Sequence, residues 1–257
     1  MSDIMPPPPP ERVLPDRPVG WELLLFLLGL LLVGILGLAV LIAVGDVLLG
    51  PQTGEMRGMP TPGNTAQAWG YLATFAVFYL AVMAAAWIAM FPHGNRRASA
   101  LGLRPAKWQW FVFGTLGVLA LSQAGDALLL PFLRDAMSIG ANELLITQVV
   151  RALTATPALI VGALLVLGVL GPVVEELVFR GLLYGWLRGF LPFALVAILT
   201  SALFGLVHGE WAHVIVAGIL GLALAFIRER SGSLWPPIVA HAVNNLVAVG
   251  GAAVLGT

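Results

Sequence analysis

The chain consists of long apolar runs separated by short segments that carry most of its charges. A membrane-spanning helix needs about 20 consecutive apolar residues. Candidate runs lie near 21–49, 66–91, 108–133, 157–188, 193–210, 212–228 and 234–256. The run at 212–228 is short, and we expect neighbouring helices to shelter it. The pattern predicts an all-α fold, a polytopic transmembrane helix bundle with about seven spanning helices.

Composition supports a membrane protein. Hydrophobic residues make up 59% of the 257 residues and charged residues 10%, whereas a soluble domain has about 25% charged residues. The formal net charge is zero and there is no cysteine. We therefore expect membrane lipid as a partner and no nucleic acid, and disulfides and thiol catalysis are excluded.

The first residues, MSDIMPPPPPERVLPDRPVG, are rich in proline and polar side chains. Such a composition has little to bury and favours extended chain over helix. We predict a disordered, proline-rich cytoplasmic tail over residues 1–20 and a helical membrane domain over 21–257. An SH3-type ligand is the alternative to a plain tail.

The basic residues of the loops predict the orientation, because cytoplasmic loops are enriched in Lys and Arg. With the N-terminus inside, nine basic residues are cytoplasmic and three external. The nine are Arg12, Arg17, Arg96, Arg97, Arg104, Lys107, Arg188, Arg228 and Arg230, and the three are Arg57, Arg134 and Arg151. We expect a cytoplasmic N-terminus and an external C-terminus, in the inner (plasma) membrane of a bacterium.

Three charged residues interrupt the apolar run GPVVEELVFRGLLYGWL: Glu175, Glu176 and Arg180. An ionisable residue within the membrane indicates a functional site. Glu176 and Arg180 are four residues apart and share a helix face, so we expect a structural ion pair. Glu175 is rotated about 100° from Glu176 and is left for chemistry.

Other polar residues lie at a similar depth. Glu175 and His208 would both be roughly 24 Å from the turn between their helices, and Asn245 roughly 20 Å from the next turn on that side. His241 lies one turn shallower than Asn245 and shares its face. Asp126 also falls in an apolar run, and we interpret it as a hydrogen-bonded polar residue rather than a ligand.

These groups suit peptide hydrolysis by activated water. A carboxylate in apolar surroundings is a stronger base than one in water. A neutral histidine can help to hold the water, and a second histidine with an asparagine can donate hydrogen bonds to an oxyanion.

The motifs EELVFR, FGLVH and HAVNN, in this order, resemble the CPBP family (CAAX protease and bacteriocin-processing, or Abi). The family pattern is EExxxR, FxxxH and HxxxN, and the family includes the type II CAAX prenyl endopeptidases. The resemblance covers about residues 100–250, including LGLRP before the third run. It implies an intramembrane endopeptidase whose peptide or protein substrate, membrane-associated or prenylated (CAAX-type), enters from the bilayer.

The resemblance also implies roles for the motif residues. Glu175 would be the general base that activates water, and His208 would assist at that water beside Phe204. His241 and Asn245 would stabilise the oxyanion. Glu176 and Arg180 correspond to the second Glu and the Arg of the first motif.

A metal is the main alternative within this interpretation. Family members are often classed as metalloendopeptidases, and zinc could be bound by Glu175, His208 and His241. In that case no separate base would remain, because Glu176 is expected to pair with Arg180. We therefore favour catalysis without a metal or other cofactor.

Two other classes of function compete with a protease. A non-catalytic scaffold or immunity-type protein could use the same cavity to bind a peptide, although the complete motif set argues against lost activity. A proton-coupled transporter would be expected to show inverted repeats or paired broken helices, and the sequence shows neither. The identity of the substrate is not encoded in a readable motif.

Overall fold

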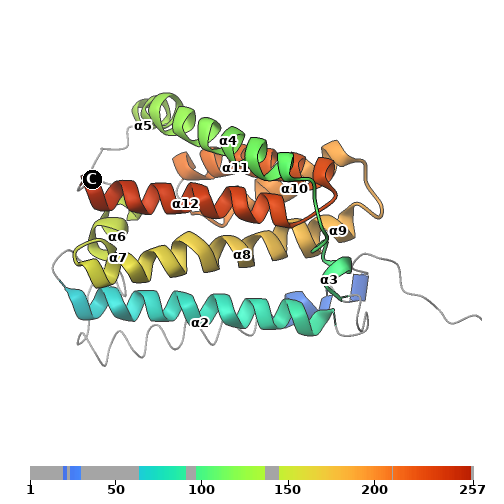
Figure 1. The fold of residues 1–257 in the computed structure, drawn as a ribbon, viewed down its shortest axis with the longest axis horizontal. Helices are drawn as coiled ribbons and strands as arrows, with labels where there is room; N and C mark the ends of the chain where they lie inside the picture. The colour runs from blue at the N-terminus through green and yellow to red at the C-terminus, as the bar shows by residue number, and fades with distance from the viewer. Residues whose placement is uncertain are drawn as a thin grey trace, which may run out of the picture.

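The protein is a bundle of long helices that lie side by side (Figure 1). The computed structural model describes residues 20–21, 24–29, 64–90, 97–136, 145–209 and 211–255. Every regular element within these ranges is helical, which confirms the predicted all-α class. The predicted tail at 1–20 lies almost entirely outside the described residues.

Five of the described helices are long and apolar enough to cross a membrane. Two of them contain π-helical segments and are continuous through several elements. The five are α2 (Thr65–Ala89); α4 (Trp108–Ala124) with η2 (Gly125–Leu129) and α5 (Leu130–Ala136); α7 (Pro157–Ala163) with η3 (Leu164–Leu170), α8 (Gly171–Glu176), η4 (Leu177–Leu183) and α9 (Tyr184–Leu187); α11 (Trp211–Ser231); and α12 (Trp235–Leu255).

The remaining helices are α3 (Arg97–Ala100), α6 (Leu145–Leu153) and α10 (Phe193–Leu206), and the described residues 20–21 and 24–29 are helical as well. With 14 residues, α10 is about 21 Å long and is shorter than the hydrocarbon core of a bilayer. The expectation that 212–228 is the short run is therefore wrong, since α11 has 21 residues and α10 is the short helix. Most of the predicted run at 21–49 lies outside the described residues.

Small residues let α10 approach α11 closely. A Cβ added at Gly205 would lie 2.3 Å from the Val214 carbonyl oxygen, and one at Gly221 would lie 3.0 Å from the Ser201 Cβ. Glycine and serine permit such close helix contacts in membranes. This packing brings the backbone of Gly221 within reach of Arg180.

The two ends of the bundle differ in charge. The end marked by α3 and α9 carries Arg104, Lys107, Arg188, Arg228 and Arg230, whereas α5 and α6 at the opposite end, where the chain terminates, carry Arg134 and Arg151 (Figure 1). The turn between α11 and α12 is tied to the α3 end, because Leu234 donates a backbone hydrogen bond to Gly102 at 2.7 Å.

Candidate active site

The centre of the site is a buried ion pair on the α8–η4 helix. Arg180 Nη1 lies 2.8 Å from Glu176 Oε1, and both side chains are fully buried. Arg180 also donates from Nη2 to the Gly221 carbonyl at 3.0 Å, and its Cζ lies 4.4 Å from the centroid of the Phe204 ring. The ion pair expected from the i, i+4 spacing is present, and α10 and α11 complete its surroundings.

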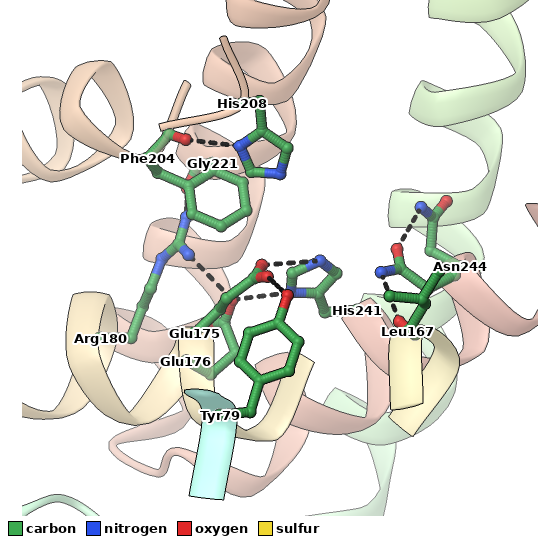
Figure 2. A network of polar contacts seen from close by, with 11 residues as sticks. Tyr79, Leu167, Glu175, Glu176, Arg180, Phe204, His208, Gly221, His241 and Asn244 are labelled. Atoms are coloured by element: carbon green, nitrogen blue, oxygen red, sulfur yellow. Dashed lines mark hydrogen bonds and ion pairs between the residues drawn. The ribbon is translucent and has the colours of Figure 1, made fainter. Parts of the chain in front are cut away.

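His241 of α12 joins this pair to Glu175 (Figure 2). Its Nδ1 lies 3.0 Å from Glu176 Oε1, and its Nε2 lies 3.8 Å from Glu175 Oε2. Because an ionised carboxylate can only accept, the contact with Glu176 assigns a proton to Nδ1. The i, i+4 spacing predicts the contact of Glu176 with Arg180 but not its contact with His241. Glu176 holds both residues, because α12 packs against α8.

Glu175 is partly accessible, with 19% of its side chain exposed. Its two oxygens have different surroundings. Oε1 accepts a hydrogen bond of 3.0 Å from the hydroxyl of Tyr79, while Oε2 is buried and has no hydrogen-bond partner among the described residues. Oε2 is therefore the oxygen that remains available to take a proton.

His208 lies just beyond the C-terminus of α10 and is exposed. Its Nδ1 is 2.7 Å from the Phe204 carbonyl oxygen, so Nδ1 carries the proton and Nε2 is an acceptor. The chain turns at Gly209, whose φ of +83° lies in a region that favours glycine. His208 is thus held in a turn and not on a helix.

The Phe204 ring connects the two histidines. Its centroid lies 4.8 Å from that of His208 and 5.6 Å from that of His241. Within the described part of the chain, His208 is linked to the Glu175–Glu176–His241 cluster through this ring and not by a direct polar contact.

Asn245 is fixed by a different helix. Its Nδ2 donates to the Leu167 carbonyl in η3 at 3.1 Å, and the neighbouring Asn244 lies 3.4 Å from its Oδ1. An amide has two N–H groups, so the contact with Leu167 uses one of them. Asn245 and His241 lie one turn apart on α12, as their spacing predicts.

Sequence reasoning missed Tyr79 and the carbonyl of Leu167. Tyr79 lies 96 residues before Glu175 and outside the motifs. A hydroxyl within an apolar span was the one signal that pointed to it. Asp126, by contrast, lies in η2 and is exposed rather than part of the buried cluster.

Comparisons with known proteins agree on one family. The family model described as "Type II CAAX prenyl endopeptidase Rce1-like" matches residues 157–247, a stretch that contains Glu175, His208, His241 and Asn245. The protein named "Putative membrane peptidase YdiL" from Bacillus subtilis (strain 168) is 25% identical over 199 residues, which cover 76% of this chain and 77% of that protein. Both matches support the CPBP (CAAX protease) family that the motifs indicate. No solved structure matches the chain significantly.

The Rce1-like match and the similarity to a membrane peptidase identify the chain as a peptidase. Together with the five apolar helices, they support an integral membrane protein and an intramembrane protease in general. Within the described residues, no three His, Cys, Asp or Glu side chains are grouped as a metal site would require. His208, one of the three residues considered as zinc ligands, packs against the Phe204 ring, and that ring also packs against His241.

Proposed function

We propose that this protein cleaves a peptide bond of a membrane-associated or prenylated (CAAX-type) substrate with water activated by Glu175. The observation that carries the proposal is the state of the Glu175 carboxylate. One oxygen is held by Tyr79. The other is buried, accepts no hydrogen bond from the part of the chain that the structure describes, and lies 3.8 Å from His241 Nε2. A general base needs such an oxygen within reach of the proton that it removes.

Each residue of the site has its own role in the proposed reaction. Glu175 Oε2 takes a proton from water while the water oxygen attacks the carbonyl carbon of the substrate. The unprotonated Nε2 of His208 helps to hold that water. When both nitrogens of His241 carry protons, Nδ1 donates to Glu176, and Nε2 joins the second N–H of Asn245 in donating to the oxyanion. Glu175 then returns the proton to the leaving amine as the C–N bond breaks.

We further propose that no metal takes part. The arrangement that supports this view is the engagement of Glu176 with Arg180 and His241, which leaves no separate base if Glu175 becomes a ligand. Catalytic zinc sites of the HExxH type use a glutamate other than their ligands as the base. Prolonged chelation of the purified protein should leave peptide cleavage unchanged. Loss of activity on chelation with recovery on adding zinc would contradict this.

Cleavage of defined peptides tests the substrate class. We would reconstitute the purified protein in liposomes with an internally quenched peptide that ends in a farnesylated CAAX sequence. The same peptide without the farnesyl group and a membrane-spanning peptide are the comparisons, and Glu175→Ala is the inactive control. We expect cleavage of at least one membrane-associated peptide by the wild type alone. Cleavage of none of them, or equal cleavage by Glu175→Ala, would overturn the proposal.

We also propose that the α3–α9 end is cytoplasmic, supported by its excess of basic residues. Lys107 and Asp135 are exposed near opposite ends of the Trp108–Ala136 helix, and the chain has no cysteine. In intact cells an impermeant maleimide should label Asp135→Cys and not Lys107→Cys. The reverse pattern would overturn the orientation.

A further inference from the structure

Tyr79 donates the hydrogen bond that holds one oxygen of Glu175, although it lies on a helix far from the motifs. Its hydroxyl is 3.0 Å from Glu175 Oε1, and α2 lies outside the stretch matched by the family model. Figure 2 shows the tyrosine extending from α2 toward the carboxylate.

The ring of Tyr79 is packed so that the hydroxyl has little freedom. Phe75 and Phe78 lie beside it with centroids at 5.9 Å each. On the other side, a Cβ at Gly171 would lie 3.1 Å from the Tyr79 hydroxyl. Gly171 is four residues before Glu175, so the ring rests against bare helix backbone one turn below the carboxylate that it contacts.

This contact makes the two carboxylate oxygens inequivalent. A carboxylate on a flexible side chain can rotate, and a fixed donor in a low-dielectric site favours one rotamer. With Oε1 bound to Tyr79, Oε2 lies 3.8 Å from His241 Nε2. We infer that Tyr79 is a positioning residue that keeps Glu175 Oε2 directed at the reacting water, an inference that rests on the proposed role of Glu175 as base.

Tyr79→Phe tests the inference, with Tyr71→Phe as a matched control. Tyr71 is on the same helix, eight residues earlier, and packs against the cluster around Leu72 and Leu159. For cleavage of the quenched peptide, Tyr79→Phe should lower kcat about tenfold, the equivalent of one hydrogen bond to a charged group. KM should change less than about twofold, because no substrate contact is lost. Tyr71→Phe should leave both constants near wild type.

A second background shows whether Tyr79 acts through Glu175. Glu175→Asp withdraws the carboxylate by one methylene, so Tyr79→Phe should have little further effect in that variant. An undiminished loss of kcat in the Glu175→Asp background, or equal kcat for Tyr79→Phe and Tyr71→Phe, would overturn the inference.

Infrared difference spectroscopy gives a readout that needs no turnover. The carboxyl band that disappears in Glu175→Gln should shift in Tyr79→Phe and stay in place in Tyr71→Phe. An unshifted band in Tyr79→Phe would show that the hydrogen bond is absent and would overturn the inference, even if Glu175→Gln is inactive. Full activity of Glu175→Gln would instead refute the proposed function, whatever the band does.

Discussion

Arg180 and Arg188, eight residues apart along the chain, each form an ion pair with a glutamate, and the two pairs differ in burial and in the helices that they involve. Arg180 and Glu176 are fully buried, whereas Arg188 and Glu229 lie at the helix end with about a third of each side chain exposed. Glu229 accepts two hydrogen bonds from Arg188 and one from Tyr184. The hydrogen bonds with Glu229 raise the pKa of Arg188 above its usual range, so the guanidinium of this outer pair stays protonated.

The difference shows which pair shapes the site. A buried charge that loses its partner is left without solvent, whereas an exposed charge is rehydrated. Glu176 also accepts from His241 Nδ1, so the inner pair orients a site residue. The outer pair joins α9 to the end of α11 and has no contact with the site histidines within the described residues.

Breaking the inner pair should have the largest effect on stability. Arg180→Met leaves the Glu176 carboxylate buried without its cation, and we expect a loss of about 3–5 kcal/mol in unfolding free energy. The measurement is chemical or thermal unfolding in detergent. Glu176→Met/Arg180→Met should recover part of the stability, because no charge remains, but should stay inactive. An Arg180→Met variant as stable as wild type would contradict the burial of the Glu176–Arg180 pair.

Removing the Phe204 ring, which lies between the Glu176–Arg180 pair and the two histidines, should have an intermediate effect on stability. Phe204→Leu loses the contact with Arg180, which for a desolvated cation is worth about 2 kcal/mol, and frees the rings of His208 and His241. We expect a lower unfolding temperature and a lower kcat. Phe179→Leu is the control, since Phe179 packs on Phe204 at 5.2 Å. Equal losses of kcat in the two variants would show that Phe204 does not position the histidines.

Sequence patterns predicted the inner pair but not its surroundings. The i, i+4 spacing was sufficient for Glu176–Arg180, since a helix fixes which residues share a face. The contacts of Glu176 with His241 and of Tyr79 with Glu175 depend on how α12 and α2 pack against α8, which no local spacing encodes. The apolar runs gave the positions of the long helices. They did not reveal that α10 ends early, because that end depends on the turn at Gly209.

Breaking the outer pair should have the smallest effect. Arg188→Gln should reduce stability by less than about 1 kcal/mol and leave cleavage within about twofold of wild type. In wild type, 1 M salt should weaken this pair and spare the buried one, because screening acts on exposed charges. A loss of kcat in Arg188→Gln comparable to that in Phe204→Leu would show that the helix end controls the site.

The most direct test of the account compares the rate of peptide cleavage by two glutamate-to-glutamine variants at the same substrate concentration. Glu175→Gln keeps the shape of the side chain and removes the base, so cleavage should fall by about 10²–10⁴-fold with an unfolding temperature near wild type. Glu229→Gln should cleave at a rate close to wild type. Activity of Glu175→Gln above about a tenth of wild type, in protein that is folded, would contradict the assignment of Glu175 as the base.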